Sequence, residues 1–509
     1  MRIRTTKTSS GATAVQVIER HHHTTDVLKH IGSATDFESL SHLRALASQY
    51  IREQNPSSPL FPEFVGDTSK HLVAVEDLVF TKAHHQAAYE FFSFFYERNG
   101  FTQILNPLLK DLAIMRLIEP CSKLQSLELL KEYFHITYGH TRLYRYLREI
   151  LAEKDQVENI AVSYAKKHLA FDFSLVFYDV TTLYFETFKE DGDTTDNKGG
   201  STTGLRKIGY GKEKKPGQPQ IVIGLVVNKD GYPISIETFS GKVFEGHTML
   251  PVIQNLKQKY AITNLTIVAD AAMLSLDNMN SIQQAGLSYI VGARTGSIPL
   301  DRLEYISKKL HKREHIFTRT KTDWGTLVCD YSKTRAAKDR SDRKKQLEKA
   351  HYQIQNPEKA KKRSRFVMEA TKATLTLNEE LIAQDKLREG IKGYYTNLKR
   401  VPSPIIVKRY HDLWHVEKSF RIAKSDLDAR PIFHHQRDSI LAHMLIVFVS
   451  LCLTKSIELV THLSLKRVKK SIWPILDIEF KDTITGKTFT KRMETKGNTL
   501  VALWRKLKK

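Results

Sequence analysis

The stretch "LVFYDVTTLYF", Leu175–Phe185, is the part of the sequence that says most about the fold. It is rich in β-branched and aromatic residues, which is typical of a strand. Both of its alternating faces are apolar, and such a strand usually lies in the middle of a sheet covered on both sides. Asp179 interrupts this pattern, and an ionised carboxylate there is costly unless it is paired or binds a metal. An Asp near a strand end, bonded to Thr181 or Thr182, is the alternative of equal weight.

The segments that follow predict a mixed sheet. "QIVIGLVVNKDGYPISIETFS", Gln220–Ser240, contains two β-rich runs around an Asp-Gly pair, which is a strong hairpin signal. A helix, the strand "NLTIVADA" at 264–271, a second helix and the strand "LSYIVGAR" at 287–294 come next. The order β-β-β-α-β-α-β predicts an α/β fold with a mixed sheet flanked by helices.

The rest of the chain is expected to form further regions around this core. We expect a helical N-terminal region, a first and a second part of the core separated by a basic, mainly β insertion, and a basic C-terminal region. A separate domain that merely follows the first part is an alternative that periodicity does not exclude. The expected boundaries are 1–165, 166–296, 297–394, 395–460 and 461–509, with a Pro/Ser-rich loop at 55–64.

Composition favours a nucleic-acid partner and a reducing compartment. The 509 residues include 79 Lys+Arg and 56 Asp+Glu, and the net charge of +23 favours a polyanion. Cys121, Cys329 and Cys452 lack CxxC spacing, which supports neither a disulfide framework nor a zinc site. The histidines at 21–23 lack other ligand types nearby, so we interpret them as solvated. No signal peptide is expected at the start, and the apolar run at 440–453 is too short for a membrane span and predicts a buried helix.

A second carboxylate, Asp270, ends the run "LTIVAD". Ligands usually bind at the carboxyl ends of parallel strands, although an Asp here could also cap the next helix. If the strand of Asp270 lies beside that of Asp179, the two acids are about 5 Å apart. Such a pair repels unless divalent cations bridge it, and hard oxygen ligands favour Mg²⁺ or Mn²⁺ over zinc.

A third carboxylate lies in "YHDLWHVEKSFRIAKSDLD", at 410–428, which predicts a single helix. Tyr410, Glu417 and Lys424 recur every seven residues and would share one stripe. Glu417 lies at the border of the apolar stripe, so we expect it at the seam between helix and sheet. A solvated face with an ordinary Glu417–Arg421 pair is the alternative. Three acids gathered there could hold two metal ions about 4 Å apart, an arrangement suited to phosphodiester displacement.

These residues carry a resemblance to a known family. "FYDVTTLYFE", "IVADAAML" and "YHDLWHVEKSFRIAK", with a basic insertion before the last, resemble the DDE transposases of bacterial insertion sequences. The similarity covers roughly residues 80–460 and is closest to the subgroup with the signature Tyr-x2-Arg-x3-Glu-x6-Lys. It implies an RNase H-like catalytic core interrupted by a mainly β insertion.

The resemblance also implies roles for single residues. Asp179, Asp270 and Glu417 would be the catalytic, metal-binding triad for two Mg²⁺ ions, with Mn²⁺ able to substitute. Tyr410 and Lys424 would contact the DNA backbone. The signature arginine is replaced by Leu413, and Arg409 or Arg421 would have to supply the missing cation. His247 would reach DNA, although a place at the start of a helix explains it equally well.

The implied reaction is DNA transposition. The enzyme would bind terminal inverted repeats, cut at the element ends and transfer the freed 3′-hydroxyl ends into target DNA. "GHTRLYRYLREI", at 139–150, suits backbone contact or a solvated face equally. A homodimer in the synaptic complex and a place at the nucleoid in the bacterial cytoplasm, with no membrane partner, would follow. A metal-dependent nuclease of the same fold, or a catalytically inactive DNA-binding regulator, are the alternatives.

Overall fold

The computed structural model describes residues 1–21, 24–54, 78–195, 201–211, 217–273, 275–357, 364–371, 374–483, 486, 488–494 and 497–508. Two compact units contain them. One unit comprises Met1–His84 and Leu476–Met493, and the other comprises His85–Ile475 and Glu494–Lys509. The loop expected at 55–64 and residues 22 and 23 of the histidine tract lie outside the described residues.

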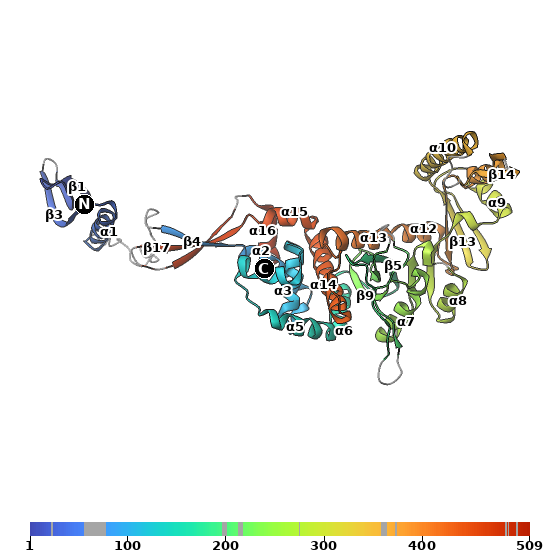
Figure 1. Cartoon of the computed structure of the whole chain (residues 1–509), viewed down its shortest axis with the longest axis horizontal. Helices are drawn as coiled ribbons and strands as arrows, with labels where there is room; N and C mark the ends of the chain where they lie inside the picture. The colour runs from blue at the N-terminus through green and yellow to red at the C-terminus, as the bar shows by residue number, and fades with distance from the viewer. Residues whose placement is uncertain are drawn as a thin grey trace. The chain divides into compact units, whose positions relative to one another are not determined.

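The larger unit is built on an eight-stranded mixed sheet (Figure 1). Five of its strands lie in the order β9-β8-β5-β10-β11, with β5, β10 and β11 parallel and β8 and β9 antiparallel to their neighbours. This is the strand order of an RNase H-like core, so the predicted fold class is confirmed. The strands are β5 (Leu175–Tyr184), β8 (Gln220–Val227), β9 (Pro233–Ser240), β10 (Thr266–Ala269) and β11 (Ser288–Gly292).

The predicted hairpin is the β8–β9 turn. The side-chain oxygen of Asn228 accepts hydrogen bonds from the amides of Asp230 (2.9 Å) and Tyr232 (2.8 Å). Gly231 has a φ of +77°, a conformation that a side chain would strain. The Asn-x-Asp-Gly sequence therefore closes this turn locally.

Helices cover both faces of the sheet, as the apolar faces of β5 require. On one face the Tyr178 hydroxyl donates to Thr248 Oγ1 (2.8 Å) at the start of α7 (Met249–Tyr260). Asp179 and Thr181 lie on the other face, which α13 (Trp414–Arg421) and α14 (Arg437–Thr461) cover. α8 (Leu276–Gln284) connects β10 to β11.

Among the described residues, α14 alone combines the length and hydropathy that crossing a bilayer would need. However, 94% of its most apolar 18-residue window is buried inside the protein. His443 within it is also buried. The interpretation of 440–453 as part of a buried core helix is therefore confirmed.

The insertion is more helical than its sequence predicts. The charged run around residues 333–355 forms a long helix, supported by i,i+4 pairs such as Arg335–Asp339 (2.7 Å). Three strands of this region extend the main sheet in the order β12-β13-β16-β11. Its elements are α9 (Leu300–Leu310), β12 (Phe317–Thr322), β13 (Gly325–Tyr331), α10 (Lys333–Gln355), β14 (Val367–Thr371), β15 (Thr374–Leu377), α11 (Glu379–Arg388) and β16 (Ile391–Thr396).

The N-terminal region is mostly helical from residue 86 onward and differs from the prediction at its start. Its helices are α2 (Gln86–Arg98), α3 (Pro107–Ile118), α4 (Lys123–Phe134), α5 (His140–Ala152) and α6 (Lys154–His168). Residues 1–34 instead form a three-stranded sheet, β1 (Arg2–Lys7), β2 (Thr13–His21) and β3 (Thr24–Ala34), followed by α1 (Phe37–Gln54). The helical expectation was wrong for residues 1–34, where the buried Val15 and Val17 alternate along β2 with the period of a strand.

The smaller unit also joins distant parts of the chain. β4 (Leu78–His84) pairs with β17 (Leu476–Asp482), which pairs with β18 (Thr488–Met493). The Thr81 hydroxyl donates to the carbonyl of Glu479 (2.9 Å), 398 positions later. The two other elements of the C-terminal region, α15 (Leu465–Ile472) and α16 (Thr499–Leu507), belong to the larger unit.

Candidate active site

The register of two parallel strands brings Asp179 and Asp270 together. β5 and β10 are parallel, and Ala269 pairs with Tyr178. The residue that follows each of them in the chain is an aspartate, Asp270 and Asp179. Asp270 directly follows the end of β10, whereas Asp179 lies within β5. Residues at equivalent positions of adjacent strands lie about 5 Å apart on the same face. Asp179 is half-buried and Asp270 is exposed. The expected juxtaposition of the two strands is therefore observed.

The predicted helix at 410–428 is three elements. α12 (Ser403–His411) ends before Asp412, α13 begins at Trp414, and a π-helix, η9, covers Ile422–Asp426. At the break the amide of Leu413 donates to the carbonyl of Tyr410 (3.1 Å), a tighter i→i−3 bond. The prediction of a single helix was wrong because the chain makes this tighter turn between α12 and α13, at the buried Leu413 (4% exposed).

Tyr410 bridges the end of α12 to the carboxylate of Asp270. Its hydroxyl donates to Asp270 Oδ1 (3.1 Å), and its ring packs on Tyr394 of β16 with centroids 4.8 Å apart. The phenol fits because β11 ends in Gly292, where a Cβ would lie 2.3 Å from the Tyr410 hydroxyl oxygen. Gly292 was missed from the sequence, although a glycine inside "YIVGAR" is a signal of close approach.

Glu417 lies near the same phenol. Burial, the charge and hydrogen bond of Asp270, and then the charges of Glu417 and Asp179 raise the pKa of Tyr410 far above its ordinary value. All three carboxylates are thus within electrostatic reach of one hydroxyl group. Glu417 is exposed on α13, which packs on β5 and β8, and Ser419 fixes this helix by donating to the carbonyl of Gly231 (3.0 Å).

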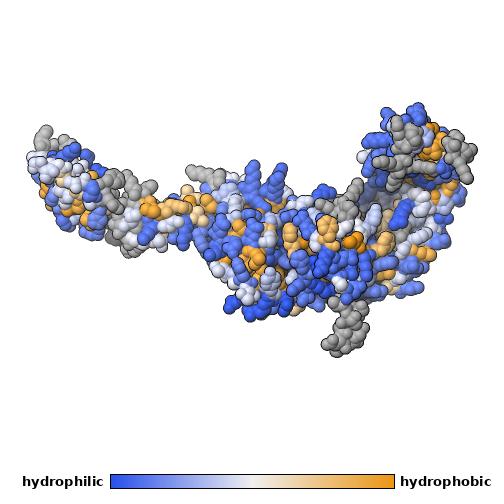
Figure 2. Space-filling view, viewed as in Figure 1, coloured by the Kyte–Doolittle hydropathy of each residue, from blue (hydrophilic) through white to orange (hydrophobic). Residues whose placement is uncertain are grey.

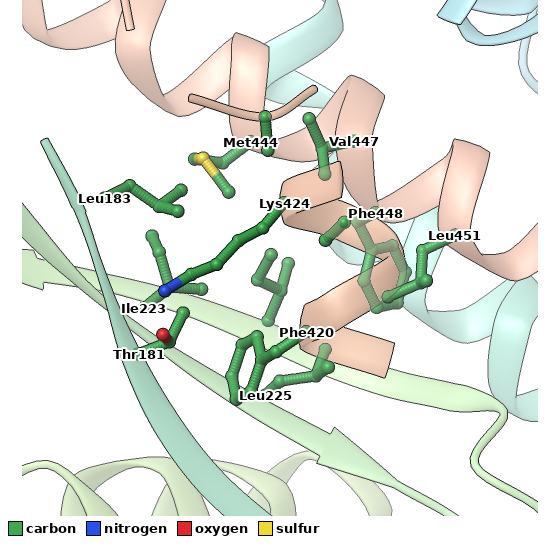
Figure 3. Close-up of a pocket in the computed structure, with 13 residues that line it drawn as sticks. Thr181, Leu183, Ile223, Leu225, Phe420, Lys424, Met444, Val447, Phe448 and Leu451 are labelled. Carbon is green, nitrogen blue, oxygen red and sulfur yellow. The ribbon is translucent and has the colours of Figure 1, made fainter. Parts of the chain in front are cut away.

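Lys424 points inward rather than along an outer stripe with Tyr410 and Glu417. It extends from η9 into a mostly apolar pocket and toward Thr181, two residues beyond Asp179 on the same face of β5 (Figure 3). The other walls come from β8, β9 and α14. The π-helix alters the helical phase here, so seven-residue spacing did not predict this direction.

The remaining predicted residues lie around the site. Arg409 forms an ion pair with Asp412 (3.4 Å). Arg421 is exposed, and no ion pair joins it to Glu417 in the part of the chain that the structure describes. His247 is exposed in η5 (Glu245–His247). Asn278 ties η5 to the segment after Asp270 by donating to the carbonyls of Gly246 (2.6 Å) and Met273 (2.9 Å).

The segment that carries these residues matches a known protein family. Residues 171–453, more than half of the chain, match the family model described as "Transposase DDE domain". The chain belongs to the DDE transposase family. The matched range contains the three carboxylates, most of both parts of the predicted core and the insertion between them.

Two solved transposase structures are similar to this transposase in part. One is a piggyBac transposase synaptic complex with hairpin DNA, with a TM-score of 0.38 and 11% identity over 84% of this chain and 74% of that chain. The other is a Mos1 transposase paired-end complex with the left transposon end, with a TM-score of 0.15 and 13% identity over 36% and 57% of the two chains. No curated protein matches the sequence.

DDE transposases generally use divalent metal ions, and the donor set of this transposase suits them. Carboxylate oxygens are the hard ligands that Mg²⁺ and Mn²⁺ prefer. Within the described residues, however, no group of three His, Cys, Asp or Glu side chains has the spacing of a formed metal site. Asp179 and Asp270 are adjacent by register, so the exposed Glu417 would have to approach them to complete a three-carboxylate site.

Proposed function

We propose that this protein is an active DNA transposase whose metal-binding triad is Asp179, Asp270 and Glu417. The observation that carries the proposal is the parallel register of β5 and β10, which sets Asp179 beside Asp270, together with Glu417 on α13, a helix that packs on β5. Membership of the DDE transposase family supports it. The reaction would be cleavage of phosphodiester bonds at the element ends, followed by transfer of the 3′-hydroxyl ends into target DNA.

Each side chain has a proposed task. The triad would hold divalent cations, two Mg²⁺ or Mn²⁺ ions, which when bound supply positive charge at the phosphate and an activated attacking oxygen. Tyr410 would orient the Asp270 carboxylate through its hydrogen bond. Lys424, beside Thr181, would present its ammonium near the carboxylates, where a DNA phosphate would lie. Arg409, Arg421 and His247 would contact DNA at the rim.

The rest of the chain would handle DNA. We propose that the region 1–165 binds terminal inverted repeats and that the insertion at 297–394 holds the duplex through its phosphates. The net charge of +23 supports both roles. A homodimer would pair the two ends, and the protein would act at the nucleoid in the bacterial cytoplasm.

The test uses DNA that carries the inverted repeats flanking the gene, with Mg²⁺ or with EDTA. Asp179→Asn, Asp270→Asn and Glu417→Gln should each bind these ends normally and lose cleavage. Asp277→Asn, an exposed carboxylate on α8, is the matched control and should cut as wild type does. Wild-type cleavage by any of the three triad variants would contradict the assignment.

The same assay separates the alternatives. With supercoiled target DNA present, a transposase yields a joined product that depends on the 3′-hydroxyl end. Cleaved ends without joined product would indicate a nuclease. Binding without cleavage, in wild-type protein with Mg²⁺, would indicate an inactive regulator.

A further inference from the structure

The short helix α15 carries an unusual concentration of positive charge. Leu465, Val468 and Ile472 bury one side of it against the rest of the larger unit. Lys466, Arg467 and Lys470 are exposed, and Lys469 is half-buried. None of these four side chains forms an ion pair within the described parts of the chain. Figure 2 shows hydrophilic side chains over α15.

This basic helix borders a cleft whose other side is formed in part by η9. The cleft, of about 620 Å³, is lined by Leu465, Lys466 and Lys469 on one side and by Ser425, Asp426 and Asp428 on the other, with Pro120. Ser425 and Asp426 belong to η9, the continuation of the helix that carries Glu417. α15 therefore lies next to the element that presents Glu417 and Lys424.

The far wall of the cleft is held in place by a buried cation. Arg116 of α3 donates through Nη1 to the carbonyls of Leu427 (2.8 Å) and Asp428 (3.0 Å), and through Nη2 to the carbonyl of Cys121 (3.2 Å). Arg116 is only 6% exposed. The end of η9 is thus fixed, and the distance from α15 to the active-site helix is set by packing.

The four cations divide into two groups. Burial lowers the pKa of Lys469, and the charge of Asp426 across the cleft opposes that shift. The positive charge of Lys469 is therefore partly offset by the carboxylate of Asp426. Lys466 also lines the cleft, and its charge acts on Asp426 as that of Lys469 does. Arg467 and Lys470 are exposed, lie within about 4.5 Å of helix rise and form no ion pair among the described residues.

We propose that the outer face of α15, formed by Arg467 and Lys470, binds the sugar–phosphate backbone of the duplex on which the active site acts. This proposal rests on the proposed function. A DNA duplex presents one negative charge about every 1.7 Å along its axis, so each of two cations over this rise can meet a phosphate. Contacts of this kind position DNA and carry no sequence information.

The alternatives of an anionic membrane or an acidic protein fit less well. A helix that binds a membrane interface needs a free apolar face, and the apolar side of α15 is buried in the fold. An acidic protein would meet a face only two turns long. The net charge of +23 for the whole chain also favours a polyanion that extends beyond one helix.

The experiment compares two double variants of the full chain that remove the same charge. Arg467→Ala with Lys470→Ala alters α15, and the control, Lys167→Ala with Lys229→Ala, alters two exposed lysines outside the regions proposed to bind DNA. Binding to a fluorescent duplex is measured by anisotropy as a function of KCl concentration, with inverted-repeat DNA and with unrelated DNA. Thermal unfolding confirms that both variants are folded.

The α15 variant should lower the slope of log K against log[salt] by about 1.8, because each phosphate contact contributes about 0.9. The loss should be the same for both duplexes, and the control variant should keep the wild-type slope. A wild-type slope for the α15 variant would overturn the proposal. So would an unchanged affinity for DNA combined with lost binding to phosphatidylserine vesicles, which would assign the face to a membrane.

Failure of this proposal is distinct from failure of the proposed function. If the α15 variant binds as wild type while Glu417→Gln abolishes cleavage, the triad stands and α15 has no role in binding. If Glu417→Gln cuts as wild type does while the salt slope of the α15 variant falls, the DNA-binding face stands and the triad assignment is wrong.

Discussion

The hydroxyl of Tyr410 donates a 3.1 Å hydrogen bond to Oδ1 of Asp270, 140 positions earlier in the chain. The bond joins α12 to the end of β10. It draws one of the two aspartates toward the helical segment that carries Glu417. The phenol also lies over Gly292, so three separate segments meet at a single side chain.

Replacing Tyr410 with Phe should lower cleavage while leaving the fold intact. The ring contact with Tyr394 remains, and only the donor to Asp270 is lost. Since Asp270 is exposed, we expect a loss of about 1 kcal/mol, or roughly fivefold in the single-turnover rate. Unchanged DNA affinity and an unchanged melting temperature would confirm a positioning role. A rate equal to wild type would contradict it.

Gly292→Ala should reduce cleavage more than Tyr410→Phe does. The new Cβ would lie 2.3 Å from the Tyr410 hydroxyl oxygen and 2.9 Å from its Cζ, so the ring itself must move. Gly296→Ala is the control, because a Cβ there meets nothing within 4 Å. Single-turnover cleavage of an end-containing duplex measures both. Equal activity of the two variants would show that the position of Tyr410 is not critical.

Arg116→Met should destabilise the larger unit. The substitution removes the hydrogen bonds to the carbonyls of Leu427, Asp428 and Cys121, which would then be left without this donor. We expect the free energy of unfolding to fall by about 3 kcal/mol. Urea denaturation measures the change, with Arg148→Met on the exposed side of α5 as the control. A change equal to that of the control would contradict the anchoring role.

Acid should destabilise the protein through His434. Burial, and then the charges of Lys123 and Arg116, lower the pKa of His434 to about 3. A histidine in the unfolded chain has a pKa of about 6.5. Below that pH, the unfolded chain therefore binds a proton at this residue that the folded chain does not bind. The contribution of neutral His434 to the free energy of unfolding is fully present above a pH of about 6.5 and is lost as the pH falls toward about 3. The loss is no more than about 1.4 kcal/mol per pH unit.

His434→Asn should therefore flatten the dependence of unfolding free energy on pH. Urea denaturation at several pH values between about 7 and about 5 gives the slope. His351→Asn, on the exposed side of α10, should keep the wild-type slope. An unchanged slope in His434→Asn would show that another group, such as the buried His443, dominates acid unfolding.

Local sequence patterns predicted much of the core. A strand that is apolar on both faces is central wherever it occurs, and β5 lies between β10 and β8. The hairpin predicted from the Asp-Gly pair is closed within five residues, by hydrogen bonds that the side chain of Asn228 accepts from the amides of Asp230 and Tyr232. The two aspartates were found because a carboxylate in or directly after an apolar strand is costly without a partner.

Other features depended on contacts between distant segments. Repeating patterns could not locate the break at Leu413, because the apolar residues keep a helical period across it. The inward direction of Lys424 follows from the π-helix that comes after α13. The insertion at 297–394 was predicted to be mainly β, yet residues 333–355 form a helix with the i,i+4 ion pair Arg335–Asp339.

The sequence by itself thus determined the succession of strands and helices in the core, the candidate acidic residues and the resemblance to the family, because these depend on residue type and local period. Only the tertiary structure decided that Asp179 and Asp270 share a register, that Tyr410 bonds Asp270 over Gly292, and that Arg116 holds the end of η9. Each of these is a contact between segments far apart in the chain. Such contacts depend on the packing and hydrogen bonding of the whole unit. The local periodicity of the sequence carries no information about them.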